Sequence, residues 1–154
     1  MLPSPKKEKT LIIGIGNDYR SDDAVGLTIA RRLRRRLKAT AKVIEQSGEG
    51  ASLIEAWRGA VSVVVIDAVM SGAAPGTIHC FEAHSQKLPK IFFHCSTHAF
   101  SLAEAIELTR ALGELPPRLV VYGIEAKNLA AGVGLSAEVE EAACQLEERM
   151  LAEM

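Results

Sequence analysis

The amino-acid sequence predicts an α/β fold in which a mostly parallel β-sheet carries helices on both faces. Two observations lead to this prediction. Short apolar runs alternate along the chain with longer stretches whose apolar residues recur at helical spacing. The strongest apolar run, residues 61–68, is rich in valine without polar alternation, which is typical of a strand buried on both faces. Such alternation predicts strand–helix–strand units, which connect parallel strands.

The first half of the chain predicts two strands and two helices before the valine strand. Residues 10–16 form a continuous apolar run that ends in glycines, which indicates a buried strand. Residues 23–37 carry Val25, Ile29, Leu33 and Leu37 at helical spacing and predict the first helix. A short strand over residues 42–46 and a helix over residues 51–57, ending near Gly59, follow.

The second half of the chain adds an edge strand, another parallel strand and two helices. Residues 77–81 alternate in polarity after Pro75-Gly76, which predicts a turn and then an antiparallel or edge strand. Residues 83–90 are a polar loop. Residues 96–112 predict a helix capped by Ser96-Thr97 and ended by Gly113. A strand over residues 118–124, a loop at Gly132-Val133-Gly134 and a helix over residues 136–151, with Ser136 as N-cap, complete the chain. We expect about five strands.

Length and composition narrow the class of protein. A chain of 154 residues fits one domain, which we place at residues 10–154 after a flexible lead over residues 1–9. Because 18 basic residues balance 19 acidic ones, we expect neither a nucleic-acid nor a membrane partner. The longest apolar stretch, residues 61–66, is too short to span a bilayer. Three cysteines without a Cys-x-x-Cys motif favour a reducing cytoplasm.

The densest run of charge, residues 31–38, contains five arginines and a lysine. It lies in the C-terminal half of the first predicted helix, where cations suit the helix dipole. We interpret it as a solvated helix face. A nucleic-acid patch or a contact with an acidic partner protein are the alternatives.

Parallel sheets place ligands and chemistry outside the carboxyl ends of their strands. Three places in the sequence meet this condition: residues 17–23, Asp67, and residues 94–98. Asp22 and Asp23 open a predicted helix, where one acid is sufficient as a cap, and we assign Asp22 that role. Asp67 ends a run that should be buried, so its carboxylate needs a partner, a metal or a solvated pocket, or else caps the following turn.

The other candidate motifs are less specific. His94 and His98 have zinc-ligand spacing, but the predicted cap between them argues against a shared helical face. Cys95 with His98 could form a thiol–imidazole pair. His79 and His84 are expected at the surface. Gly14-Ile15-Gly16 matches half of a dinucleotide fingerprint, whose third glycine would fall at Tyr19, and we therefore expect no organic cofactor.

Taken in order, these motifs resemble the nickel–iron hydrogenase maturation endopeptidases. The opening signature is Leu11-Ile12-Ile13-Gly14-Ile15-Gly16-Asn17, followed by Asp22-Asp23 and Gly26. Ile66-Asp67-Ala68 resembles the second motif of that family, and Ser96-Thr97-His98 with Leu102-Ala103 resembles the third. Tyr122-Gly123-Ile124-Glu125 and Gly134-Leu135-Ser136 are also similar. The resemblance extends from about residue 10 to the last helix.

This resemblance implies a three-layer αβα sandwich and a proteolytic activity. Members of the family remove a C-terminal extension from the precursor of the hydrogenase large subunit after nickel has been inserted. Their metal-recognising residues are an acid, an aspartate and a histidine, which correspond to Asp23, Asp67 and His98. Two carboxylates and an imidazole suit nickel or zinc. The nickel would belong to the substrate, and either Asp23 or Asp67 would act as general base toward water.

The sequence departs from the family pattern at two places. Asp23 stands where several members have the longer glutamate. Residues 45–50, Glu-Gln-Ser-Gly-Glu-Gly, replace an Asp-Gly-Gly-Thr stretch, and this loop is expected to help select the partner hydrogenase.

Two alternatives to the endopeptidase remain. One is a non-catalytic metal- or precursor-binding maturation factor on the same fold. The other is a zinc hydrolase of small substrates, against which the absence of His-Glu-x-x-His and Cys-x-x-Cys counts. A protease that docks a large precursor needs an open face, and we therefore expect a monomer.

Overall fold

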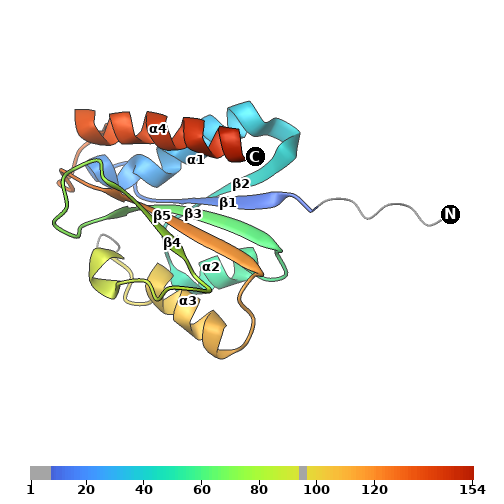
Figure 1. The fold of residues 1–154 in the computed structure, drawn as a ribbon. Helices are drawn as coiled ribbons and strands as arrows, with labels where there is room; N and C mark the ends of the chain where they lie inside the picture. The colour runs from blue at the N-terminus through green and yellow to red at the C-terminus, as the bar shows by residue number, and fades with distance from the viewer. Residues whose placement is uncertain (1–7, 94–96) are drawn as a thin grey trace.

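A computed structural model describes residues 8–93 and 97–154 and contains one five-stranded sheet with the order β2-β1-β3-β5-β4 (Figure 1). Four of the strands are parallel: β1 (Thr10–Ile15), β2 (Ala41–Gln46), β3 (Ser62–Val69) and β5 (Arg118–Glu125). The edge strand β4 (Ile78–Glu82) runs antiparallel to β5. The prediction of a mostly parallel sheet with one antiparallel edge strand is confirmed.

Helices cover both faces of the sheet, which confirms the three-layer αβα sandwich. Helices α1 (Val25–Leu37) and α4 (Ala137–Glu153) lie on one face. Helices α2 (Gly50–Trp57) and α3 (Leu102–Ala111) lie on the other, as Figure 1 shows. Three short 3-10 helices are η1 (Ser21–Ala24), η2 (Lys38–Thr40) and η3 (Lys90–Phe93).

The central strand β3 explains why the layers hold together. Its side chains alternate between two cores: Val64 and Ile66 pack under α1 and α4, whereas Val63 and Val65 pack under α2 and α3. Every residue of β3 after Ser62 is buried. A strand in this position must be apolar on both sides, which is what its run of valines indicates.

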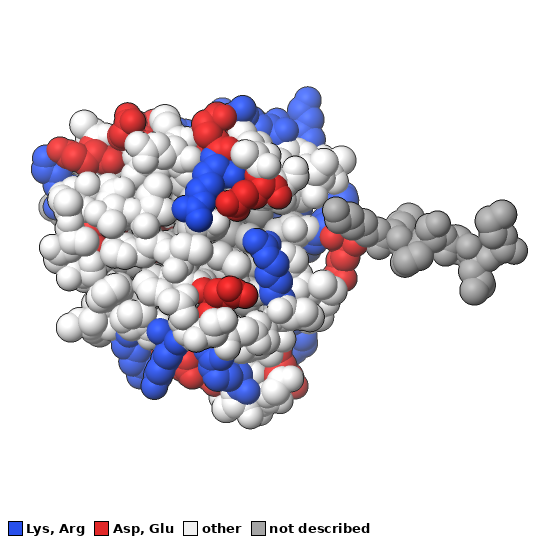
Figure 2. Space-filling model, in the orientation of Figure 1, with Lys and Arg blue, Asp and Glu red and all other residues white. Residues whose placement is uncertain are grey.

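The arginines of the basic run in α1 are exposed or half-buried, and most of them form ion pairs. Arg32 pairs with Glu140, and Arg36 with Glu147 and Glu148, so these two arginines join α1 to α4. Arg31 and Arg34 both contact Glu45 on β2. Figure 2 shows positive and negative side chains interspersed over these helices. The interpretation of this run as a solvated helix face is confirmed, and most of its arginines are paired with acidic residues of the same chain.

The predicted start of the first helix is wrong. Residues 21–24 form η1, and α1 begins only at Val25, so Asp23 lies in a 3-10 turn. The cause is local: the backbone N–H of Asp22 donates to the carbonyl of Asn128, and Ser21 has a φ of 52°. Both features turn the chain before a regular helix can begin.

The predicted start of the helix over residues 96–112 is also wrong. Helix α3 begins at Leu102, where the Glu104 carboxylate accepts hydrogen bonds from the backbone N–H and the hydroxyl of Ser101. This capping box outcompetes the Ser96-Thr97 signal, which lacks an acid three residues later. His98 therefore lies in the loop before α3. His94, Cys95 and Ser96 lie outside the described residues, as does most of the predicted flexible lead.

Candidate active site

The carboxyl edge of the sheet lies at the left of Figure 1. At this edge Asp23 lies close enough to Asp67 for the two carboxyls to interact electrostatically. Asp67 lies near the end of β3, and Asp23 lies in η1, which follows β1. Glycines permit this approach. A Cβ at Gly16 would lie 2.2 Å from the carbonyl oxygen of Asp23, and a Cβ at Gly26 would lie 2.3 Å from the Ile15 and Ile66 carbonyl oxygens. Because these neighbours are backbone atoms, no larger residue fits without moving the turn.

Asp67 is a buried carboxyl in an unfavourable position for a charge. It is 5% exposed, and one of its oxygens accepts a hydrogen bond of 2.8 Å from the backbone N–H of Ala68. Burial raises the pKa of Asp67 well above its ordinary value, and the nearby carboxylate of Asp23 raises it further. The sequence predicted a partner for this carboxylate, but its nearest charged neighbour is a second carboxyl, which adds to the cost of ionising it.

Asp23 is similarly buried, with 6% of its surface exposed. Burial raises its pKa, while the positive charge of Arg20 and a hydrogen bond from the backbone N–H of Asn17 oppose the shift. Two coupled carboxyls with raised pKa values titrate as a pair, so one proton can be retained where isolated carboxyls would lose theirs. Such a pair can take a proton with one member and supply one with the other.

Asp22 has a structural role. It is fully buried and accepts hydrogen bonds from the backbone N–H groups of Lys127, Asn128 and Ser136, and from the Ser136 hydroxyl. Burial alone would raise the pKa of Asp22, but these hydrogen bonds together lower it. The prediction that Asp22 caps its own helix is therefore wrong: its carboxylate instead holds the loop before α4 and Ser136, the N-cap residue of that helix.

His98 lies beside the turn between β2 and α2. Its Nε2 atom is 3.1 Å from the hydroxyl oxygen of Ser47. Two contacts of Phe100 hold the loop that carries His98. The backbone N–H of Gly50 donates to the Phe100 carbonyl at 2.8 Å, and the Phe100 ring occupies the space that a side chain at position 50 would fill. The Glu49 carboxylate accepts from the N–H groups of Ala51 and Ser52. These bonds lower its pKa, with a smaller contribution from His98.

The structure thus unites two of the three predicted site residues. Among residues 8–93 and 97–154, no three His, Cys, Asp or Glu side chains converge closely enough to hold a metal ion. The assignment of Asp23, Asp67 and His98 as one metal-recognising set stays a prediction. The zinc pair of His94 with His98 and the thiol pair of Cys95 with His98 fall partly outside the described residues.

A cluster around Glu125 was missed from the sequence. This buried carboxylate accepts hydrogen bonds from the backbone N–H and the hydroxyl of Ser71, and it lies 3.3 Å from Nε2 of His79. The prediction that His79 is a surface residue is wrong, because its half-buried ring also stacks on Phe81. His84 is exposed, as predicted. Like Asp67, Glu125 lies at the end of an apolar strand, and this sequence feature would have pointed to a buried carboxylate.

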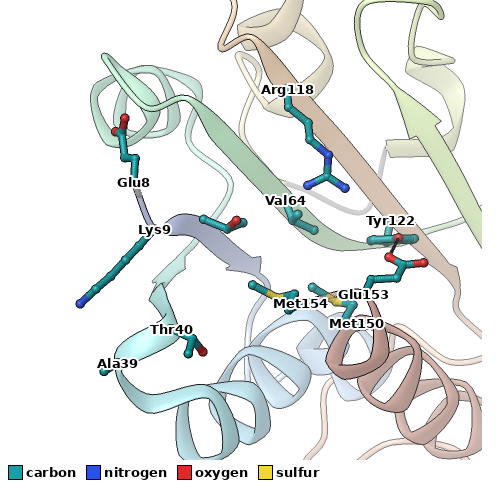
Figure 3. A pocket seen from close by; sticks show the side chains of 11 residues that line it. Glu8, Lys9, Ala39, Thr40, Val64, Arg118, Tyr122, Met150, Glu153 and Met154 are labelled. Atoms are coloured by element: carbon teal, nitrogen blue, oxygen red, sulfur yellow. Dashed lines mark hydrogen bonds between the residues drawn. The ribbon is translucent and has the colours of Figure 1, made fainter. Parts of the chain in front are cut away.

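A cavity in the described part of the chain lies away from the carboxyl pair. It has a volume of about 490 Å³, and Val64, Tyr122, Met150 and Met154 contribute apolar walls (Figure 3). Its lining also includes Thr10 and Arg118, the first residues of β1 and β5, so it opens at the amino edge of the sheet. None of the predicted site residues contributes to it, and we do not assign it the chemistry.

A comparison with protein families identifies the chain. The family model HycI, hydrogenase maturation protease, matches residues 27–153. The chain belongs to the hydrogenase maturation protease family. The matched region contains Asp67 and His98 and begins four residues after Asp23.

Curated relatives of this maturation protease carry related names. The hydrogenase 2 maturation protease of Escherichia coli is 27% identical over 136 residues, which cover 86% of this chain and 82% of that protein. The hydrogenase expression/formation protein HupD of Thiocapsa roseopersicina is 28% identical over 123 residues, covering 77% of this chain and 55% of that longer protein.

Solved structures support the same assignment. The hydrogenase maturating endopeptidase HybD from E. coli superposes with a TM-score of 0.80 and 26% identity, over 94% of this chain and 91% of that one. The [NiFe] hydrogenase maturation protease HybD from Thermococcus kodakarensis gives a TM-score of 0.67 at 25% identity, over 94% and 97% of the two chains. The protein is therefore a peptidase of hydrogenase maturation. None of its described helices has the length and apolar character that crossing a bilayer requires.

Proposed function

We propose that this maturation protease removes the C-terminal extension from the nickel-loaded precursor of a nickel–iron hydrogenase large subunit. The observation that carries the proposal is the buried, coupled carboxyl pair of Asp23 and Asp67 at the carboxyl edge of the sheet. Peptide hydrolysis needs a base that activates water and an acid that protonates the leaving amine. A carboxyl pair that retains one proton can supply both.

The nickel belongs to the substrate in this proposal. Asp23, Asp67 and His98 offer two carboxylates and an imidazole, a donor set that suits divalent nickel. The precursor would bring its metal to the carboxyl pair, and recognition of the metal would align the scissile bond with the base. Comparison of cleavage by Asp23→Asn and Asp67→Asn identifies the aspartate that takes the proton from water. No organic cofactor takes part.

A cleavage assay tests the proposal directly. Nickel-loaded precursor is incubated with wild-type enzyme, Asp23→Asn, Asp67→Asn and the control Asp18→Asn, and its shortening is followed by mass spectrometry. Asp18 lies in the same connection between β1 and α1 as Asp23, but its carboxylate pairs with Arg31. We expect both site variants to lose cleavage and the control to keep it. Binding of precursor by the wild-type enzyme without cleavage would instead indicate a non-catalytic maturation factor.

We further propose that the enzyme acts as a monomer in the cytoplasm. The two cysteines within the described residues, Cys80 and Cys144, are free thiols at exposed positions, which suits a reducing compartment. The carboxyl edge must remain open for the precursor. Light scattering during size-exclusion chromatography measures the mass, and a dimer that covers Asp67 would contradict this proposal.

A further inference from the structure

The three most exposed large apolar side chains among the described residues are Val133, Tyr19 and Ile91, at 83%, 74% and 67%. Tyr19 and Val133 lie in loops at the carboxyl edge, which also carries Asp23 and Asp67. Ile91 lies in η3, next to Phe92, whose carbonyl accepts from the first residue after β3. Single exposed apolar residues are ordinary on any protein. Their gathering around a buried carboxyl pair is not, because that edge is where a polypeptide substrate has to lie.

Tyr19 and Val133 occupy one side of the edge. The backbone N–H of Gly132, the neighbour of Val133, donates to the Tyr19 carbonyl at 2.9 Å. The loop that carries Val133 packs into the core beneath α1 and α4 through Leu129 and Leu135. Two exposed apolar residues, from the loops after β1 and β5, thus lie next to each other above one face of the sheet.

This side is held rigid by buried polar contacts. Asp22 binds the N–H groups of Lys127, Asn128 and Ser136, and the Ser21 hydroxyl donates to the Ala130 carbonyl at 2.8 Å. Ser21 keeps a φ of 52°, which residues other than glycine adopt only where neighbouring bonds require it. A loop that is ordered before it binds loses little entropy when a partner docks.

Met70 and Ile91 occupy the other side of the edge. Met70 is the first residue after β3, three positions beyond Asp67, and its N–H donates to the carbonyl of Phe92 at 2.9 Å. Phe92 and Phe93 pack into the core beneath α2 and α3. This second exposed pair therefore lies over the opposite face of the sheet, and the end of β3 with Asp67 lies between the two pairs.

We propose that these two pairs form a docking rim that grips apolar residues of the precursor polypeptide on either side of its scissile segment. The inference rests on the proposed function, because it is the precursor that must reach Asp67. The contacts are apolar, because each pair consists of large apolar side chains that are exposed to solvent. A second copy of this chain is a poorer occupant, since it would cover the carboxyl pair and exclude the substrate.

Paired serine variants test each side of the rim. The variants are Tyr19→Ser/Val133→Ser and Met70→Ser/Ile91→Ser. The matched control is Val61→Ser/Leu112→Ser, which removes two exposed apolar side chains at the amino edge. Cleavage of nickel-loaded precursor gives KM and kcat, and isothermal titration calorimetry gives Kd for the precursor. The proposed reaction gives none of the substituted residues a chemical role. Circular dichroism checks that each variant folds.

We expect each rim variant to raise KM and Kd roughly tenfold, as loss of an apolar anchor at an interface does, with kcat within about twofold of wild type. The control variant should keep all three values. If the wild-type enzyme cleaves and the rim variants match the control, the rim is refuted and the proposed function stands. If the wild-type enzyme binds the precursor without cleaving it, and the rim variants bind more weakly, the proposed cleavage is refuted and the docking rim is supported. A wild-type enzyme that binds no precursor, or that dimerises through the rim, overturns the inference.

Discussion

Asp67 shows how a single residue can be placed against its own electrostatic preference. Its carboxyl lies at the end of a strand that is apolar on both faces, and its described hydrogen-bond donor is the N–H of Ala68. The nearby Asp23 adds negative charge and not compensation. Such an arrangement costs stability, and proteins retain it where a poised proton or a ligand contact is needed.

The variant Asp67→Asn should therefore be inactive and more stable. The amide removes a buried carboxylate while keeping its shape, so we expect cleavage to fall by at least about 100-fold, the contribution of a general base. Thermal unfolding at pH 7 should occur about 2–4 °C higher, which corresponds to a gain of ~1 kcal/mol in a domain of this size. Calorimetry and the precursor assay measure the two effects.

The stability gain of Asp67→Asn should depend on pH with a defined sign. Because the pKa of Asp67 is raised in the folded chain, the folded state holds its proton more tightly than the unfolded state. Wild-type stability is thus undiminished below the ordinary pKa of an aspartate and decreases as pH rises through the folded pKa. The difference between variant and wild type should vanish in acid, and a difference that grows in acid would contradict the burial argument.

The coupling between the two aspartates gives a second residue-level prediction. In Asp23→Asn the negative charge beside Asp67 is gone, so the pKa of Asp67 should be lower than in the wild type. Carbon-13 NMR of the aspartate carboxyl groups follows this titration. Asp18→Asn is the control, because Asp18 pairs with Arg31, and it should leave Asp67 unchanged. An identical pKa in all three proteins would show that the carboxyls are not coupled.

At the scale of elements, the regular structure could be predicted from the sequence, including Ser136 as the N-cap of α4, but the starts of α1 and α3 could not. Periodicity predicts strands and helices because burial requires it, as the valine run of β3 illustrates. The starts of α1 and α3 depend on contacts between distant residues or on competing caps. The N–H of Asp22 binds Asn128, 106 residues away, and no local pattern contains that contact.

The loop before α4 depends on Asp22, which leads to a prediction for Asp22→Ala. Removal of the carboxylate leaves the N–H groups of Lys127 and Asn128 without their acceptor, so we expect a loss of roughly 2–4 kcal/mol in unfolding free energy. Urea denaturation measures the loss, and hydrogen exchange should accelerate at those two amides. The control Asp18→Ala removes an exposed ion pair and should cost about 0–1 kcal/mol. Equal losses would mean that Asp22 is not the anchor.

At the scale of the whole molecule, the sequence placed the candidate residues at the correct edge but could not show how they meet. Asp23 and Asp67 converge because Gly16 and Gly26 let η1 and α1 lie against the sheet. His98 instead lies beside Ser47, held by the packing of Phe100 over Gly50. Side-chain direction within a loop is set by such tertiary contacts, and spacing along the chain carries no information about them.

Asp23 and Asp67 lie together, whereas His98 lies beside Ser47, and this separation leads to a prediction about where nickel binds. In the described chain, Asp23 and Asp67 lie together and no third ligand converges on them, so the enzyme alone should hold nickel weakly. A substrate that brings its own metal would complete the site. In equilibrium dialysis at roughly micromolar free nickel, we expect far less than one ion per chain for the enzyme, and one ion per complex once precursor is added. Treatment of the precursor with a chelator before mixing should abolish cleavage, whereas the same treatment of the enzyme should not. Tight, stoichiometric metal in the enzyme alone would instead favour the zinc hydrolase, and would mean that His98 joins the carboxyl pair without its substrate.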